Sequence, residues 1–566
     1  MRHKWVVSRT NPEFLDYLSK EASISRVLAQ VLVNRGIKDT AAIKDFLNPS
    51  IESLHDPFLL PDIERAVLRL KAALEKGETV LVHGDYDADG ITSTALLVSV
   101  LRKLGIRTFY HIPNRMTEGY GFGDRGIEKA VECGAGLIVT VDCGISSAKE
   151  VAAAASKGID VIVTDHHEPP EELPAALAIV NPHRKDSEYP FKYLAGVGVV
   201  FKLVQALAGA LHVTPLQNEE LRIDELLDLV ALGTIADSVA LVGENRVFAA
   251  RGLEEIRKDG CRPGLAALKE ASGVDSEMQA GRLSYTLIPR INAAGRLDDA
   301  NEVVELFLSE DRDRAKEIAQ HLDVQNRERQ KIEADVLESA VKMIDPNNPG
   351  NAIVLWSDEW HPGVIGIVAS RLVGMFYRPV FLFSVQGPVA KGSARSIPPL
   401  NLYRAIVECS ELLTAFGGHR QAAGLKISTE NLPAFREMMN ARVEKTLTPE
   451  EMIPILEIDA PLRFSDLNFS IVRELGLLEP FGESNREPVF ATKEIAVVYQ
   501  KIVGNNHLKM RLRQERKDMD AIGFNLGEMI EELEKAQSLD VAFVPGINEW
   551  NGMKNLQLNI KAIRPS

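Results

Sequence analysis

Residues 79–95 constrain the fold more strongly than any other stretch of the sequence. The short run at 79–82 is apolar and rich in β-branched residues, which predicts a buried strand. Apolar residues at helical spacing from Ile91 to Leu104 predict a helix that ends near Gly105.

The loop between the expected strand and helix carries His83, Asp85, Asp87 and Asp89 and closes with Gly90. Three carboxylates and an imidazole in so short a loop repel one another unless a cation neutralises them. Hard oxygen ligands with a single imidazole suit Mn²⁺ or Mg²⁺ better than a metal that prefers thiolates. The loop therefore predicts a metal site.

Two other interpretations fit this loop less well. An EF-hand calcium loop also opens with alternating aspartates, but its twelfth position needs a glutamate, and that position is Leu96 when counting starts at Asp85. A solvated turn that only caps the helix needs one acidic side chain rather than three. The metal site is therefore favoured.

The overall charge argues against a protein coated with basic residues for nucleic acid. The 566-residue chain has a formal net charge of −15 at pH 7, with 26% charged and 45% hydrophobic residues. These values are typical of a soluble globular protein, and the length predicts roughly three or four domains. A local positive groove is still compatible with this charge, because binding follows the local field.

The cysteines and the N-terminal residues predict a reducing compartment. Cys133, Cys143, Cys261 and Cys409 are scattered and form no CxxC pair, which predicts reduced thiols. The first ten residues lack the apolar core of a signal peptide, and no run has the length of a transmembrane helix. We therefore expect a cytoplasmic protein without a membrane partner.

A regular alternation of strands and helices begins near residue 64. Strand-like runs lie at 80–82, 108–112, 137–141, 161–164 and 178–180, with helix-like stretches between them. This order predicts an α/β fold with a parallel sheet and helices on both faces. In such sheets, ligands bind beyond the carboxyl ends of the strands.

Further acidic and histidine residues come directly after these strands. Asp142 follows the third strand, Asp165, His166 and His167 follow the fourth, and Asp237 ends an apolar helix. Each has a structural explanation when taken alone, as a helix cap, a hydrogen-bonded turn or a helix end. Their joint placement at one edge of one sheet favours a two-metal centre instead.

Four short motifs carry a family resemblance. They are His-Gly-Asp-Tyr-Asp-Ala-Asp-Gly at 83–90, Val-Asp-Cys-Gly-Ile at 141–145, Thr-Asp-His-His at 164–167 and Gly-Thr-Ile-Ala-Asp at 233–237. In this order they resemble the motifs of the DHH phosphoesterase family, and most closely its RecJ exonuclease branch. The resemblance extends over nearly the whole chain.

The resemblance implies two Mn²⁺ or Mg²⁺ ions. The implied metal ligands are His83, Asp87, Asp89, Asp142, His166 and Asp237. One ion would be held by the first two of these, the other by Asp89, His166 and Asp237, and Asp142 would bridge the ions. The ions would activate a water that attacks phosphorus in line. The implied catalytic residues are Asp142, Asp165 and His167, with His167 facing the phosphate.

Other residues are candidates for substrate contacts. Arg115 and Tyr120 lie in a glycine-containing loop that suits phosphate and base contacts, although an ordinary surface loop has the same composition. Arg290 and Arg296 flank a turn of small residues that suits bidentate binding of phosphate, whereas the alternative is an ion pair with an acid such as Asp298. The resemblance favours phosphate binding.

The changes in sequence pattern, together with the resemblance, predict five segments. Residues 1–50 carry amphipathic helical patterns and are expected to form a helical cap packed on the domain after it. The other segments are a DHH catalytic domain at 51–300, a linking helix at 301–348, an α/β DHHA1 substrate-binding domain at 349–448 and an OB-type β-barrel at 449–566.

Two glycine-rich segments, 391–396 and 416–424, resemble parts of the DHHA1 domain. Glycine turns are common, so each segment alone is a weak signal, but backbone amides in such turns can bind phosphate. The resemblance implies that Ser393 and Arg395 recognise a 5′-terminal phosphate, and that His419 lies near the scissile group.

The expected barrel combines short strands with basic and aromatic residues, which is typical of proteins that bind single strands. The candidate contacts are Lys501, Lys509, Arg511, Arg513 and Trp550. The alternative is a structural flap with solvated basic residues. The resemblance favours nucleic-acid binding.

Taken together, these features imply a metal-dependent 5′→3′ exonuclease that hydrolyses single-stranded DNA to nucleoside 5′-monophosphates in DNA repair and recombination. The implied partners are single-stranded DNA, a helicase and a single-stranded-DNA-binding protein, and we expect a monomer. One rival is a phosphodiesterase of short oligoribonucleotides or a cyclic dinucleotide, against which the extra barrel argues. The other is a strand-binding scaffold without metals, against which the complete set of motif aspartates argues.

Overall fold

The computed structural model describes residues 3–115, 117–119, 121–211, 223–274, 278–297, 299–550 and 552–566. The chain divides into two compact units. One contains Met1–Val7 and Asn326–Ile458, and the other contains Ser8–Gln325 and Asp459–Ser566. Within the described ranges, no helix combines the length and the apolar character needed to cross a membrane.

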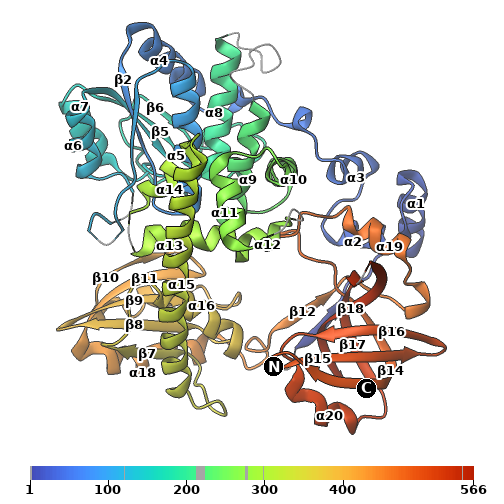
Figure 1. The fold of residues 1–566 in the computed structure, drawn as a ribbon. Coiled ribbons are helices and arrows are strands. Elements are labelled where there is room, and N and C mark those ends of the chain that lie inside the picture. The colour runs from blue at the N-terminus through green and yellow to red at the C-terminus, as the bar shows by residue number, and fades with distance from the viewer. Residues whose placement is uncertain are drawn as a thin grey trace. The chain divides into compact units, whose positions relative to one another are not determined.

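The larger unit contains a five-stranded parallel sheet (Figure 1). Its strands are β2 (Thr79–His83), β3 (Thr108–His111), β4 (Ala135–Val141), β5 (Asp160–Thr164) and β6 (Ala178–Val180). They lie in the order β3-β2-β4-β5-β6, so the chain reverses its direction across the sheet after β3. The carboxyl ends of strands at such a reversal form the binding crevice of open α/β sheets. The predicted parallel sheet is confirmed.

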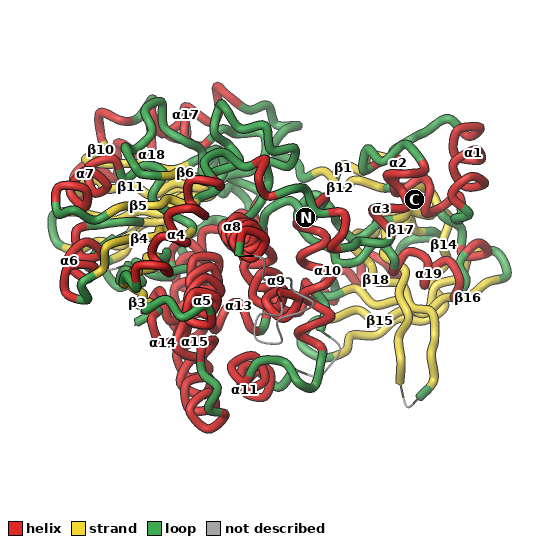
Figure 2. Tube along the Cα trace, turned by 90° about the horizontal axis from the view of Figure 1, so that it is seen from above, coloured by secondary structure: helices red, strands yellow, loops and turns green. Residues whose placement is uncertain are grey.

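Helices cover both faces of this sheet, as predicted (Figure 2). One face carries α4 (Ile63–Lys76), α5 (Ala88–Lys103) and α8 (Gly196–Ala210), and the other carries α6 (Asp124–Glu132) and α7 (Ala148–Ser156). Val80 and Val82 of β2 belong to the core under the first set of helices, and Leu81 belongs to the core under the second. Successive side chains of β2 therefore point to opposite faces.

Further helices complete the core around α5. They are α9 (Leu227–Ala236), α10 (Gly243–Arg257), α11 (Pro263–Ser272), α12 (Ala280–Tyr285), α13 (Leu287–Leu297) and α14 (Asn301–Leu308). The linking segment, expected as one long helix or two in line, consists of two helices, because α14 ends before α15 (Arg312–Lys342) begins. Asp311 starts α15 by accepting a hydrogen bond from the backbone N–H of Asp313 at 2.9 Å.

The C-terminal strands form the predicted barrel. The closed ring consists of β14 (Phe490–Val503), β15 (His507–Gln514), β16 (Lys517–Gly523), β18 (Met553–Pro565) and β17 (Leu539–Trp550), in that order. Pairing of β17 with β14 closes the ring. The short β13 (Ala460–Pro461) pairs with β14, and α19 (Phe469–Gly476) and α20 (Ile530–Glu534) accompany the strands.

The N-terminal helices differ from the expectation of a cap packed on the domain directly after it. These helices are α1 (Pro12–Ala22), α2 (Arg26–Asn34) and α3 (Thr40–Leu47). Leu18 and Leu28 share one hydrophobic cluster with Phe490 and Phe543 of the barrel. The amphipathic pattern identified the helices correctly, but it does not specify which apolar surface their buried side chains contact.

The smaller unit contains a mixed five-stranded sheet in the order β10-β11-β9-β8-β7. Its strands are β7 (Ile353–Ser357), β8 (Val380–Gln386), β9 (Val389–Arg395), β10 (Leu413–Gly418) and β11 (Ala422–Ser428). The accompanying helices are α16 (Ile365–Phe376), α17 (Leu402–Val407) and α18 (Leu432–Thr446). A separate parallel pair joins β1 (Lys4–Val7) to β12 (Ile455–Ile458).

Candidate metal centre

Three groups of side chains beyond the carboxyl ends of β2, β4 and β5 have ligand atoms close enough to hold metal ions. They are Asp85, Asp87 and Asp142; Asp89, His166 and Asp237; and Asp142, His166 and His167. Within each group the ligand atoms lie within 4.8 Å of one another. The shared members, Asp142 and His166, join the three groups into one centre.

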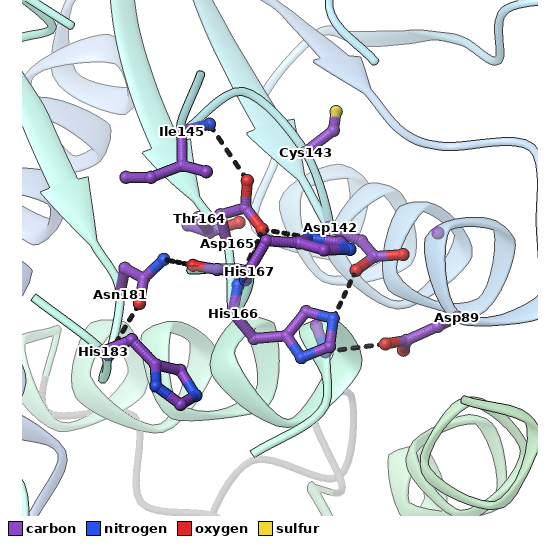
Figure 3. Close-up of polar contacts among 12 residues, drawn as sticks. Asp89, Asp142, Cys143, Ile145, Thr164, Asp165, His166, His167, Asn181 and His183 are labelled. Carbon is purple, nitrogen blue, oxygen red and sulfur yellow. Dashed lines mark hydrogen bonds and ion pairs between the residues drawn. The ribbon is translucent and has the colours of Figure 1, made fainter. Parts of the chain in front are cut away.

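Asp142 and His166 point toward each other at this centre (Figure 3). Oδ1 of Asp142 lies 3.1 Å from Nε2 of His166, which is 3.6 Å from Oδ2 of Asp237. Asp142 has a left-handed backbone with φ of 61°, and its N–H donates to the carbonyl of Thr164 at 3.0 Å. Backbone strain of this kind is retained where the surrounding structure fixes a functional side chain.

Asp87 and Asp89 are both held by backbone N–H groups. Oδ1 of Asp87 accepts from the N–H groups of Asp89 and Gly90 at 3.0 and 3.1 Å, so Asp87 caps α5. The buried carboxylate of Asp89 accepts from the N–H groups of Gly196 and Val197 at 2.7 and 2.9 Å, at the start of α8. A helix N-terminus stabilises a negative charge, so these bonds favour the carboxylate form of Asp89 and fix its orientation.

The carboxyl groups raise one another's pKa values because they are buried together. Burial, followed by the charge of Asp87, raises the pKa of Asp85 to about 8 and that of Asp89 to about 7. Burial and the charges of Asp89 and Asp87 raise the pKa of Asp237 to about 8 and that of Asp142 well above its ordinary value. Four acids that resist ionisation at one place form a site for cations.

These acids also fit hard divalent ions by their chemistry. The buried Oδ1 of Asp85 has no hydrogen-bond partner among the described residues, although a buried polar oxygen normally has one. Carboxylate oxygens with one or two imidazoles suit Mn²⁺ or Mg²⁺. The neutral form of His166 that a metal requires is favoured, because burial and then the charge of His167 lower its pKa to about 4.

Asp165 orients His167 and belongs to none of the three groups of possible metal ligands. Its Oδ1 lies 2.7 Å from Nδ1 of His167 and also accepts from the backbone N–H of His166 at 2.7 Å, while Oδ2 accepts from Ile145 N–H at 3.0 Å (Figure 3). Burial alone would lower the pKa of His167, but the hydrogen bond and the charge of Asp165 raise it to about 9. His167 is therefore a cation at neutral pH.

His83, expected as a metal ligand, lies in none of the three groups. Side chains alternate along β2, so His83 shares the face of Leu81 and its ring packs edge-on against Phe122, 5.1 Å between centroids. Burial, followed by the charge of His111, lowers the pKa of His83 to about 3. Asp85 completes the group with Asp87 and Asp142 that was expected to include His83.

The expected substrate arginines have different surroundings. Arg115 is exposed and lies over the ring of Tyr86 in the metal loop, 5.3 Å from its centroid, whereas Tyr120 is outside the described residues. Arg290 is mostly buried and forms an ion pair with Asp323 at 2.7 Å. This is the alternative to phosphate binding that the sequence left open, although the acid named there as an example was Asp298. The side chain of Arg296 is outside the described part of the structure.

Two asparagines near the centre were missed by reasoning from the sequence. Oδ1 of Asn292 on α13 accepts from the N–H of Ala88 at 2.9 Å, at the start of α5. Nδ2 of Asn181, directly after β6, donates to the carbonyl of His167 at 2.9 Å. The signal for Asn181 was its place at the carboxyl end of a strand. Asn292 lay in the segment that was chosen for its arginines.

In the smaller unit, Ser393 and Arg395 lie beside the first turn of α16. A Cβ on Gly366 would come within 2.9 Å of Oγ of Ser393 and 3.3 Å of a guanidinium nitrogen of Arg395. His419 is exposed in the turn between β10 and β11, and Ala422 of β11 pairs with Arg395 of β9. Ser393 and Arg395 thus lie beside a helix N-terminus, which is suited to an anion.

The expected basic residues of the barrel lie on β14 and β15. Lys501 is paired across these strands with Lys509, and Tyr499 is paired with Arg511. Arg511 and Arg513 both contact Asp518, at 3.3 and 2.6 Å. The side chain of Trp550 is outside the described part of the structure. The two lysines are therefore the stronger candidates for phosphate contacts.

Three family models match the chain. They are the DHH family N-terminal domain at residues 79–234, the DHHA1 domain at 330–445 and the RecJ OB domain at 458–562. The single-stranded-DNA-specific exonuclease RecJ of Bacillus subtilis is 39% identical to this chain. The match covers 99% of this chain and 70% of the Bacillus subtilis protein. The chain belongs to the RecJ family. The predicted membership is confirmed.

Other members of the RecJ family support this assignment over most of their lengths. The RecJ exonuclease of Dickeya dadantii is 37% identical over 96% of both chains. A crystal structure of RecJ in complex with Mn²⁺ from Thermus thermophilus matches with a TM-score of 0.85 and 32% identity, covering 100% of this chain and 80% of that one. The complex of that protein with Mg²⁺ gives a TM-score of 0.80 at 31% identity, covering 100% and 78%.

Proposed function

We propose that this chain is a metal-dependent exonuclease that hydrolyses single-stranded DNA from its 5′ end and releases nucleoside 5′-monophosphates. Its RecJ relatives are named single-stranded-DNA-specific exonucleases, and two of the solved structures similar to it contain Mn²⁺ or Mg²⁺. The observation that carries the proposal is the place of Asp142, which shares one group with Asp85 and Asp87 and lies 3.1 Å from His166 of another.

The proposed ligand sets correspond to these groups. Asp85, Asp87 and Asp142 would hold one ion, and Asp89, His166 and Asp237 would hold the other. Two ions in such a site supply a water activated for attack and neutralise charge on the phosphate oxygens. The chain supplies fixed carboxylates, because N–H groups of α5 and α8 hold Asp87 and Asp89 before substrate binds.

His167 has a separate role in this proposal. Its Nδ1 is held by Asp165, so the ring presents Nε2 to the phosphate as a cation. A positioned N–H donor stabilises the charge that develops on a phosphate oxygen in the transition state. Asp165 is a positioning residue here, and Asp142 and His167 are the catalytic residues.

Substrate contacts extend the proposal beyond the metal centre. Ser393 and Arg395 recognise the 5′-terminal phosphate, and His419 contacts the DNA near the scissile group. Arg115, which lies over the ring of Tyr86, contacts the DNA strand next to the metal loop. The barrel binds the rest of the strand through Lys501 and Lys509. These roles use the proposed division into a catalytic segment at 51–300, a DHHA1 segment at 349–448 and a barrel segment at 449–566.

The proposed cellular process, location and partners follow from the substrate. Single-stranded DNA is produced during DNA repair and recombination, so we place the protein in the cytoplasm with a helicase and a single-stranded-DNA-binding protein as partners. We propose that it acts as a monomer.

Timed digestion of end-labelled strands tests the proposal. A long strand with a 5′-phosphate should lose mononucleotides from its 5′ end with Mn²⁺ or Mg²⁺ and remain intact with a chelator. A dinucleotide, offered in parallel, should be the poorer substrate. Release of nucleotides from the 3′ end, or a preference for the dinucleotide, would contradict the proposal.

Asp142→Ala provides the matched test of the metal centre. This change should abolish Mn²⁺ binding at one or both sites and lower the rate by more than about 100-fold. Asp160→Asn is the control, because Asp160 lies at the opposite end of β5 and pairs with Arg69 at 2.7 Å. Unchanged activity in a folded Asp142→Ala protein would exclude the mechanism.

A further inference from the structure

Asn292 comes from a part of the chain that lies outside all three matched family models. Residues 235–329 fall between the model of the DHH N-terminal domain and that of DHHA1, and α13 lies within them. From α13, Oδ1 of Asn292 accepts a hydrogen bond of 2.9 Å from the N–H of Ala88. Ala88 is the first residue of α5 and separates Asp87 from Asp89.

This bond gives a third N–H group at the start of α5 a hydrogen-bond partner. The first N–H groups of a helix have no partner within the helix. Asp87 accepts from two of them, those of Asp89 and Gly90, through the single oxygen Oδ1. Asn292 accepts from the N–H group of Ala88, so Oδ2 of Asp87 is not needed to cap the helix. One oxygen of Asp87 therefore fixes the helix and the other is available for a cation.

The helix that carries Asn292 is itself anchored on both sides. Gly295 approaches the carbonyl oxygen of Tyr86 so closely that a Cβ would not fit there. Arg290 lies two residues before Asn292. It pairs with Asp323 at 2.7 Å and donates a hydrogen bond to the carbonyl of Thr286 at 2.7 Å. Asn292 is therefore placed against the metal loop by a rigid element.

We propose that Asn292 is a positioning residue for the metal centre. By holding the N–H of Ala88, it fixes the backbone that aims the carboxylates of Asp87 and Asp89 toward two different ions. This inference rests on the metal sites of the proposed function. Residues that orient metal ligands typically change metal affinity by about 10- to 100-fold when they are removed.

The test is direct measurement of Mn²⁺ binding by titration calorimetry and electron paramagnetic resonance. Asn292→Ala should weaken binding by about tenfold, and Asn292→Asp should restore it because a carboxylate oxygen can accept the same bond. At saturating Mn²⁺, the rate of Asn292→Ala should return close to the wild-type rate. Only the Mn²⁺ concentration for half-maximal activity should rise.

Asn440→Ala is the matched control. Oδ1 of Asn440 accepts from the N–H groups of Asn351 and Ala352 at 3.0 and 2.9 Å in the smaller unit, so the same kind of bond is lost away from the metal loop. Its Mn²⁺ affinity should equal that of the wild type. Wild-type affinity in Asn292→Ala, with or without a lower melting temperature, would overturn the inference. Failure of the wild-type protein to bind Mn²⁺ would instead overturn the proposed function.

Discussion

Oδ1 of Asp165 contacts His167 twice, once at the imidazole ring and once at the backbone N–H of His167. Oδ1 of Asp165 lies 2.7 Å from Nδ1 of His167 and 3.0 Å from its backbone nitrogen. Asp165 is almost fully buried, so its charge acts on the imidazole with little screening by water. The pair thus fixes the orientation of the ring and keeps its proton at neutral pH.

The pH dependence of the rate should reflect this pair. Because Asp165 raises the pKa of His167 to about 9, the wild-type rate should fall as the pH rises through about 9. In Asp165→Asn the raising charge is lost, so the fall should occur near or below the ordinary histidine pKa of about 6.5. Rate profiles at saturating Mn²⁺ measure this shift, and an unchanged alkaline limb would contradict the role given to His167.

Gly196 should tolerate no side chain because it faces Asp142. A Cβ at Gly196 would come within 2.5 Å of Oδ1 of Asp142, at the first turn of α8. Gly196→Ala should therefore displace that carboxylate and weaken Mn²⁺ binding by about tenfold or more.

Gly209 provides the control at the other end of the same helix. A Cβ there has no neighbour within 4 Å, so Gly209→Ala should keep wild-type Mn²⁺ affinity. It should also stabilise the fold by about 0.5–1 kcal/mol, because alanine loses less backbone entropy in a helix. Calorimetric binding and thermal unfolding measure both effects, and equal affinities for the two variants would refute the role of the contact.

The stability of the metal-free protein should fall as the pH rises from about 6.5 to about 9. In this range the folded state binds more protons than the unfolded state, because the pKa values of Asp85, Asp237 and His167 are raised to about 8, 8 and 9. Stability falls with pH whenever the folded state holds the additional protons. His166, with its pKa lowered to about 4, opposes this trend only near the lower end of the range, where the unfolded state still holds part of its proton.

Thermal unfolding in chelator at the two ends of this range measures the effect. Saturating Mn²⁺ should remove most of the pH dependence, because the ions replace the protons on the carboxylates. A melting temperature of the chelated protein that rises with pH over this range would contradict the description of the acidic centre.

The barrel lysines should affect long substrates only. Reversing the charges of Lys501 and Lys509, which are paired across β14 and β15, should weaken binding of a long single strand. The plot of the logarithm of the binding constant against the logarithm of the salt concentration should also become less steep, by about 0.7 in slope for each phosphate contact that is lost. Cleavage of a dinucleotide should stay unchanged. Lys535→Glu, after α20, is the control, and equal losses in both variants would argue for a nonspecific charge effect.

Much of this fold could be predicted because its local patterns are strong. The apolar run at 79–82 and the helical spacing after Ile91 correspond to β2 and α5. The rule that ligands gather at the carboxyl ends of parallel strands correctly predicted that Asp142 and His166 would meet. These predictions needed only local periodicity and the topology that it implies.

The remaining features depend on tertiary contacts that local patterns do not encode. His83 has the chemistry of a ligand, but the alternation of β2 turns it toward Phe122, and this could have been found by counting along the strand. The pairing of Arg290 with Asp323, a side chain 33 positions away, could not. The same applies to Asn292, because its partner is a backbone N–H, which every residue except proline carries.

The hydrophobic cluster shared by α1–α3 and the barrel has a consequence for synthesis of the protein. Leu18 and Leu28 emerge from the ribosome long before Phe543 and Leu558, the barrel residues with which they form a core. The first helices must therefore wait, with their apolar faces exposed, until translation is nearly finished. Such a chain should depend on chaperones that cover these faces, and an early stop in translation should leave an aggregation-prone N-terminus.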